Sequence, residues 1–234
     1  MKHGIFALAL LSVVTSAYAG EFTSSVYEIG SGRKHLLFTY HVIETPRRIE
    51  TSYRPAGQPE VEAVHETVEF DDAENHRIHS YSTKNSQLES TSHLEVKGKS
   101  IFFTYTRGGK TKNDDEDLPE NLIVPPTTGD FMERHWKEIL KGDSVDARVA
   151  VMARAETVGF TFHKVKEESL NGKKVVIVKM KPTSIFISAL VDPLIFTCDA
   201  TSGTVIAFTG RTLPRVLIDG KWRDLDAETV INKN

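Results

Sequence analysis

Short runs in which apolar and polar residues alternate recur along most of the chain, and turn residues separate them. A period of two is typical of strands with one buried face, and turns between such runs indicate hairpins. The first pair spans 22–29 and 34–43, on either side of Gly30-Ser31-Gly32, and further strands are expected at 49–54, 61–70, 76–82, 86–96 and 101–106. The pattern predicts a mainly β protein made of consecutive antiparallel hairpins.

A later turn at Asp219-Gly220 defines a strand register. This dipeptide suits a type I′ turn, in which both central residues need positive φ. A two-residue turn here places Leu217 opposite Trp222 and Arg215 opposite Asp224. An apolar pair and a pair of opposite charge both favour that alignment.

A similar turn at Asn171-Gly172 brings lysines together. The same register rule places Lys164 opposite Lys179, with Lys166 and Lys181 nearby. Like charges directly opposite each other are unfavourable unless they are solvated, offset by acids or useful toward an anion. The four lysines are therefore either ordinary solvated surface or a surface for an anionic partner.

One segment has the spacing of an amphipathic helix. Asp130 precedes the apolar stripe of residues 131–141 as an expected N-cap, Glu133 follows three residues later, and Gly142 ends the segment. Such a stripe must be buried, and a sheet is its expected partner. We expect a strongly curved antiparallel sheet, a half-barrel or barrel-like meander of hairpins, packed on one amphipathic helix. Residues 111–120 are expected to form a polar loop.

Several expected strands are apolar on both faces, for example at 101–103, 175–178 and 194–196. Such strands are covered on both sides. The cover is either a filled, sandwich-like core or a curved sheet around an apolar cavity. The aromatic residues that would line such a cavity are Phe38, Tyr40, Phe103, Tyr105 and Trp136.

Composition excludes several classes of protein. The 234 residues are 39% hydrophobic and 26% charged, with a formal net charge of −3 and one cysteine. This is too apolar for a disordered chain and not basic enough for a typical nucleic-acid-binding protein. A single cysteine excludes an intrachain disulfide scaffold.

The first 19 residues have the pattern of a secretory signal peptide. Lys2 precedes a short apolar run, which ends in the small-residue site Ala17-Tyr18-Ala19. The run is too short to cross a bilayer, which takes about 20 apolar residues. We expect cleavage after Ala19, one β-rich domain over 20–234, and a periplasmic or secreted location.

Candidate catalytic and metal motifs are incomplete. His65-Glu66 begins a zinc-protease pattern, but Glu69 replaces its second histidine and the flanks look extended. The acidic run 113–117 lacks the glycine and the final glutamate of a calcium loop. Cys198 reads as a buried apolar residue rather than a nucleophile. We name no catalytic residue, metal ligand or cofactor, and we lean against an enzyme.

The last third of the chain resembles uncharacterised exported bacterial domain-of-unknown-function proteins. The residues that carry the resemblance are Met180-Lys181-Pro182-Thr183, Val191-Asp192-Pro193-Leu194, Asp199, Gly203 and Gly210-Arg211-Thr212, together with the helix that contains Trp136. Those families are distantly similar in architecture to periplasmic lipoprotein carriers, in which a curved sheet closes over helices. The resemblance implies carrier function, although this chain offers one clear helix.

Three functions remain open at this point. The first is an exported envelope protein that binds or carries a lipid or another apolar ligand. The alternatives are a structural or assembly factor of the cell envelope, and an envelope hydrolase whose catalytic groups are dispersed in sequence. The expected partners are a lipid, an apolar small molecule or an envelope protein. We expect no nucleic acid, and we do not expect an integral membrane protein.

Overall fold

The computed structural model describes residues 20–184 and 192–232. The predicted signal peptide over 1–19 and the motif residue Val191 lie outside the described residues. No helix within the described ranges is both long and apolar enough to span a membrane.

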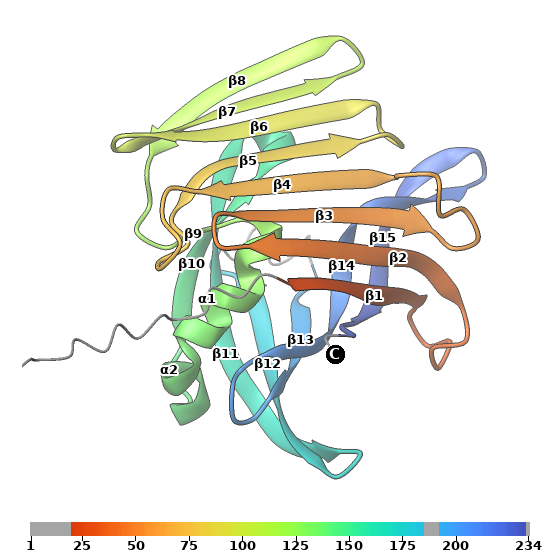
Figure 1. The fold of residues 1–234 in the computed structure, drawn as a ribbon, viewed down its shortest axis with the longest axis vertical. Helices are drawn as coiled ribbons and strands as arrows, with labels where there is room; N and C mark the ends of the chain where they lie inside the picture. The colour runs from red at the N-terminus through yellow and green to blue at the C-terminus, as the bar shows by residue number, and fades with distance from the viewer. Residues whose placement is uncertain (1–19, 185–191, 233–234) are drawn as a thin grey trace, which may run out of the picture.

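One large sheet dominates the described chain (Figure 1). Its order is β8-β7-β6-β5-β4-β3-β2-β1-β15-β14-β13-β12-β11-β10-β9, and every neighbouring pair is antiparallel except β9 with β10. The strands are β1 Gly20–Glu28, β2 Leu36–Thr45, β3 Arg48–Pro55, β4 Val64–Phe70, β5 Ile78–Asn85, β6 Ser90–Lys97, β7 Ser100–Arg107, β8 Lys110–Asp117, β9 Leu122–Ile123, β10 Val145–Val151, β11 Glu156–Leu170, β12 Lys173–Pro182, β13 Leu194–Asp199, β14 Val205–Ile218 and β15 Lys221–Val230. The prediction of a mainly β, largely antiparallel protein is confirmed.

Strand β8 corrects the sequence analysis, which expected a polar loop over 111–120. Lys110–Asp117 pairs along its whole length with β7, from Arg107 opposite Lys110 to Ser100 opposite Asp117. Most of its side chains are exposed, and its alternation is hidden because nearly every residue is polar. Charged side chains are common on edge strands because they discourage pairing with other chains.

The helical segment also differs from the prediction. Two short helices, α1 (Thr128–Arg134) and α2 (Trp136–Lys141), follow a 3-10 turn at Pro125–Thr127. Asp130 is therefore inside the first turn of α1 and is not the N-cap. The helix breaks at His135, whose Nδ1 lies 2.7 Å from the Glu138 carboxylate. Gly142 does end the segment, with the left-handed φ of 99° that a glycine cap adopts.

Three clusters of buried apolar residues fill the space inside the sheet. The first joins the helices to β10–β13 and centres on Phe131, Trp136 and Phe162. The second lies under β3–β7 and includes Phe103, and the third packs β1–β4 against β15 and includes Phe38. The helices α1 and α2 thus lie against the inner face of the sheet and pack mainly on β10–β13 (Figure 1).

Side chains, rather than a strand ladder, connect the first edge strand to the far half of the sheet. The Glu116 carboxylate on β8 accepts hydrogen bonds from the Thr157 amide at 2.8 Å and the Thr157 hydroxyl at 2.7 Å, at the start of β11. The Lys112 ammonium donates to the Arg154 carbonyl just before that strand. The sheet therefore curls until its halves meet, while its edge strands remain unpaired with each other.

The two predicted hairpin registers have different outcomes. In β14–β15, Leu217 pairs with Trp222 and Arg215 with Asp224, as predicted. In β11–β12 the predicted register ends at a bulge between Lys164 and Lys166. Beyond it, Lys164 faces Val178 and Lys179 faces His163, so the predicted Lys164–Lys179 pair is wrong. One extra residue in a strand shifts every later pair by one.

Candidate functional site

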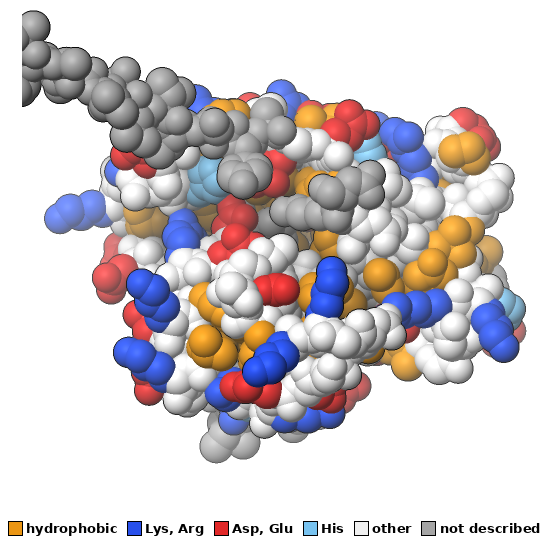
Figure 2. All heavy atoms as spheres, turned by 60° about the horizontal axis from the view of Figure 1, so that its bottom comes forward, with side chains coloured by type: hydrophobic (Ala, Val, Ile, Leu, Met, Phe, Trp, Pro, Cys, Tyr) orange, Lys and Arg blue, Asp and Glu red, His pale blue; other side chains and the backbone are white. Residues whose placement is uncertain are grey.

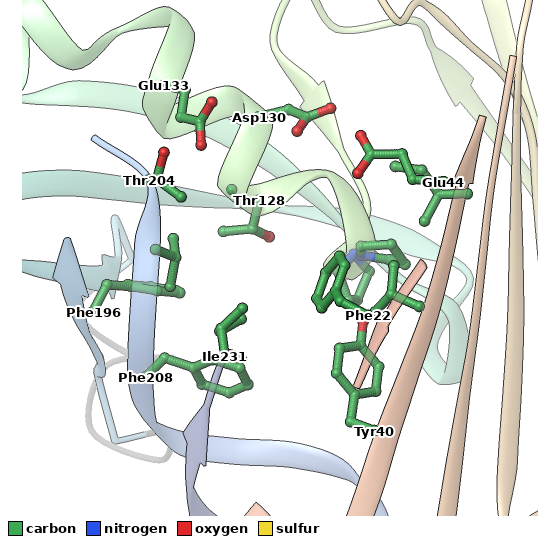
Figure 3. A pocket seen from close by; sticks show the side chains of 16 residues that line it. Phe22, Tyr40, Glu44, Thr128, Asp130, Glu133, Phe196, Thr204, Phe208 and Ile231 are labelled. Atoms are coloured by element: carbon green, nitrogen blue, oxygen red, sulfur yellow. The ribbon is translucent and has the colours of Figure 1, made fainter. Parts of the chain in front are cut away.

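A cavity of about 120 Å³ lies where α1 meets the inner face of the sheet (Figure 3). Segments from both ends and the middle of the chain contribute to its wall. The lining residues are Phe22, Tyr40, Val42, Glu44, Ile49, Pro125, Pro126, Thr128, Gly129, Asp130, Glu133, Phe196, Thr204, Val205, Phe208 and Ile231.

The floor of this cavity is apolar because of strand alternation. Phe22 on β1 pairs with Val42 on β2, and Tyr40 lies two residues before Val42 on the same face. Phe208 on β14 and Ile231 after β15 close the opposite side, and Figure 3 shows their side chains across the cavity from Tyr40. The arrangement offers contact surface to a ring or a short hydrocarbon chain.

The rim of the cavity is acidic. Glu44 comes from the end of β2, and Asp130 and Glu133 come from α1; Figure 3 shows all three carboxylates at one edge. The Asp130 carboxylate lies 2.8 Å from Nδ1 of His76. That hydrogen bond is the main reason why the pKa of His76 is raised, and the charges of Asp130 and Glu44 act in the same direction. The rim therefore carries three carboxylates, one of which is paired with His76.

His76 is held in place from two sides. Its φ of 47° is in the left-handed region, and its ring stacks on Phe70 with the centroids 4.5 Å apart. The Arg134 guanidinium donates to the neighbouring Asn75 carbonyl at 2.7 Å and so ties α1 to the same turn. The β4–β5 turn is thereby fixed to α1 at the rim.

Two fully buried hydroxyls lie beside the cavity floor. Ser24 Oγ and Thr229 Oγ1 have no hydrogen-bond partner within residues 20–184 and 192–232, and both residues are 0% exposed. Ser24 pairs with Tyr40, and Thr229 pairs with Phe208, two of the lining residues. Strand pairing therefore places both hydroxyls on the cavity-facing side of the sheet. Buried hydroxyls without a partner are uncommon in proteins.

A buried carboxyl group lies behind Tyr40. Glu66 on β4 accepts hydrogen bonds from the Tyr81 hydroxyl at 2.5 Å and from the Thr51 hydroxyl at 2.8 Å. Burial is the largest effect on the pKa of Glu66 and raises it. The Tyr40 ring packs on Tyr53 with centroids 4.4 Å apart, directly beside this network. The wall behind the cavity thus contains a buried hydrogen-bond network of Glu66, Tyr81 and Thr51.

The five aromatic residues named from the sequence lie in different places. Tyr40 lines the cavity. Phe38, Phe103 and Trp136 are buried in three separate core clusters, and Tyr105 lies on β7. The acidic rim was missed, because Glu44, Asp130 and Glu133 are far apart in sequence or were assigned to helix capping. The adjacent prolines at 125–126 were the available signal for an irregular wall.

The four lysines named from the sequence also separate. Lys164 and Lys181 line a second, open hollow of about 590 Å³ beside His163. The Lys164 ammonium is already engaged, since it donates to the Leu140 carbonyl at 2.7 Å and to Glu167 at 3.0 Å. Lys166 forms an ion pair with Glu168, and Lys179 on β12 faces His163 on β11. Burial, followed by the charges of Lys181 and Lys179, lowers the pKa of His163.

Other reactive groups do not gather in the described residues. No group of three or more His, Cys, Asp or Glu in the described part of the chain is placed to hold a metal ion. Cys198 is buried, and burial raises the pKa of its thiol to about 12, so it stays protonated at neutral pH. Among the described residues, no Ser or Cys lines the cavity.

Comparison with known proteins adds a structural likeness. No protein-family model and no curated protein matches this chain. A crystal structure of a beta-barrel-like protein of the domain of unknown function DUF1849 from Brucella abortus is similar in part, with a TM-score of 0.46 and 11% identity. The match covers 90% of this chain and 92% of that chain.

Proposed function

We propose that this protein is an exported binding protein that takes the apolar end of a small amphiphilic ligand into the cavity between α1 and β2. The observation that carries the proposal is the combination of an apolar floor and an acidic rim in one cavity. The export part of the proposal rests on the signal-peptide pattern of residues 1–19.

The size of the cavity limits what can enter. Binding pockets for drug-sized molecules are usually about 300–1,000 Å³, and an engineered apolar cavity of about 150 Å³ binds benzene. A volume of about 120 Å³ suits one ring or a short alkyl segment. The rest of the ligand then extends past the rim, as expected of a binder or carrier that grips one end of an apolar molecule.

The acidic rim selects the head group. Glu44, Asp130 and Glu133 disfavour a carboxylate or phosphate at the mouth and favour a neutral or cationic head. We therefore expect the ligand to be an amine-bearing or uncharged amphiphile rather than a fatty acid.

Gly129 offers a direct test. It lies in α1 and lines the cavity, and a Cβ added there would meet only Val205, at 3.9 Å. Gly129→Leu should fill the cavity, while Gly129→Ala should leave most of it open and support the helix by about 1 kcal/mol. Calorimetric titration of the full chain with octylamine should show binding to wild type and Gly129→Ala, and at least tenfold weaker binding to Gly129→Leu.

Octanoate is the matched control for the head group, since it has the same chain length and the opposite charge. It should bind at least tenfold more weakly than octylamine at pH 7. Equal binding of octylamine to all three proteins would contradict the proposal, provided that thermal unfolding shows Gly129→Leu to be folded. Tighter binding of octanoate would contradict the role of the rim.

A further inference from the structure

The hairpin of β14 and β15 extends past the strands on either side of it (Figure 1). Pairing between β1 and β15 ends where Glu28 meets Ala227, and pairing between β13 and β14 ends at Thr209. Residues 221–226 therefore pair with β14 alone. At about 3.3 Å per residue, six residues correspond to a ribbon of roughly 20 Å.

Contacts at its base hold this ribbon in a fixed direction. The Gln87 side chain in the β5–β6 turn accepts a hydrogen bond from the Arg215 amide at 2.7 Å and donates to the Arg215 carbonyl at 3.0 Å. Asn85 donates to the Leu213 carbonyl at 3.4 Å. These hydrogen bonds fix the base of the hairpin to the β5–β6 turn, so the end of the hairpin around Asp219-Gly220 projects in a defined direction.

The tip carries large apolar side chains in water. Leu217 is 56% exposed, Ile218 48% and Trp222 43%, and Leu217 and Trp222 form a cross-strand pair. Figure 2 shows that hydrophobic side chains and Lys and Arg side chains both reach the surface on one face of the molecule. Exposed apolar groups that are contiguous mark interaction sites more often than single ones do.

The charges at the tip point to an anionic partner. Lys221 and Arg223 are exposed, and neither has an ion pair recorded in the described part of the chain. Asp224, by contrast, forms ion pairs with Arg211 and Arg215. Lys221 and Arg223 are the neighbours of Trp222 along β15, and strand alternation puts them on the opposite face of the hairpin from Trp222 and Leu217, with Asp219 in the turn as the opposing charge.

We propose that the tip of the β14–β15 hairpin docks on the surface of an anionic phospholipid bilayer, with Trp222 and Leu217 in the interfacial region and Lys221 and Arg223 against the head groups. Tryptophan is favoured at that interface because its ring is apolar and its N–H is polar, and each nearby basic residue adds attraction to anionic lipid. The proposal does not depend on what the cavity binds.

The β11–β12 hairpin is a natural control. It also exposes apolar side chains, Val165 at 51% and Leu170 at 40%. Glu167 and Glu168 pair with two of its lysines, Lys164 and Lys166, while Lys173 and Lys174 are exposed beside the turn. Its exposed apolar side chains are aliphatic and include no tryptophan of the kind favoured at a membrane interface, so we expect this hairpin to contribute less than β14–β15 to membrane binding.

Vesicle binding tests the proposal. The full chain is mixed with vesicles of phosphatidylcholine containing about 30% phosphatidylglycerol as the anionic lipid, and binding is measured by sedimentation. Wild type should bind these vesicles at least tenfold more strongly than pure phosphatidylcholine vesicles, and binding should fall steeply as salt rises. Because the chain has two tryptophans and Trp136 is buried, a blue shift of emission on binding reports Trp222.

Paired variants in the same full chain separate the hairpin from any contribution of residues 1–19. Leu217→Ser with Trp222→Ser should lower the partition coefficient at least tenfold, and Lys221→Gln with Arg223→Gln should lower it about tenfold at low salt. Val165→Ser with Leu170→Ser should change it less than twofold. Unchanged binding by both β14–β15 variants would overturn the proposal. The proposal would also be overturned if the wild-type protein did not bind vesicles and instead formed a dimer through Trp222 in sedimentation velocity experiments.

Discussion

Glu66 is an acidic residue in an almost fully buried position. It is 1% exposed, and its two recorded hydrogen-bond partners are the hydroxyls of Tyr81 and Thr51. Burial raises the pKa of this carboxyl group above its usual value. The folded protein therefore favours the protonated form, and the contribution of Glu66 to stability is present at low pH. That contribution is lost as pH rises through the raised pKa of the folded state.

Glu66→Gln should remove this pH dependence, because glutamine has nearly the same shape and does not ionise. In urea unfolding between pH 4 and pH 8, its free energy of unfolding relative to wild type should increase with pH. Glu66→Ala should lose about 3 kcal/mol, since it leaves two buried hydroxyls without a partner and a cavity. Glu69→Gln on the exposed face of β4 is the control. A relative stability that falls with pH in Glu66→Gln would contradict the argument.

A close contact with the β13–β14 turn helps to position the helix pair. The Trp136 ring of α2 lies over Gly203, where an added Cβ would be 2.6 Å from Cδ2 of the ring. The Trp136 indole N–H donates to the Ala200 carbonyl at 3.2 Å in the same turn. Gly203 also has a φ of 83°, which an L-residue with a side chain rarely adopts. The turn between β13 and β14 thus holds α2, and through it α1 and the cavity wall.

Gly203→Ala should destabilise the protein by about 3 kcal/mol, because a clash with Trp136 adds to the strain of a positive φ. Gly98→Ala is the matched control, since Gly98 has a φ of 63° but open space around its Cα. It should cost about 1 kcal/mol. Thermal unfolding of the three proteins measures both values, and equal losses would show that the ring contact adds nothing.

The curled shape of the molecule brings together strands that are far apart in the sheet, and side-chain hydrogen bonds connect β8 to the start of β11. Glu116 on β8 binds both the amide and the hydroxyl of Thr157, and the Arg148 side chain donates to the same hydroxyl at 2.9 Å. Strand β8 pairs with β7 and has no ladder on its other side. Its attachment to the rest of the inner wall therefore depends on side chains.

Glu116→Ala should loosen β8 while the rest of the sheet stays folded. We expect faster hydrogen exchange of the amides in Lys110–Asp117 and a loss of about 2 kcal/mol in unfolding free energy, because a charged acceptor of two hydrogen bonds is removed. Asp115→Ala, an exposed neighbour on the same strand, should change neither. The same exchange rates in both variants would contradict this role for Glu116.

Particular residues show which features of the structure could be predicted from the pattern of apolar, polar and turn residues. The β14–β15 register and the end of α2 at Gly142 were predicted, because a turn dipeptide and a glycine cap are specified within a few residues. Strand β8 was not, since it pairs through backbone groups that leave no apolar alternation. The sequence contains no signal for the bulge beside Lys164 either. That bulge shifts the register, so that Lys164 and Lys179 no longer face each other.

The alternation and turns of this sequence were sufficient for a largely antiparallel β protein, because side-chain period and turn chemistry are local properties. The cavity required the tertiary structure. Its floor joins Phe22 to Phe208 and Ile231, and its rim joins Glu44 to Asp130, residues brought together only when the sheet curls over α1. The burial of Glu66 and the exposure of Trp222 were decided in the same way, since burial depends on what packs against a strand face from elsewhere in the chain.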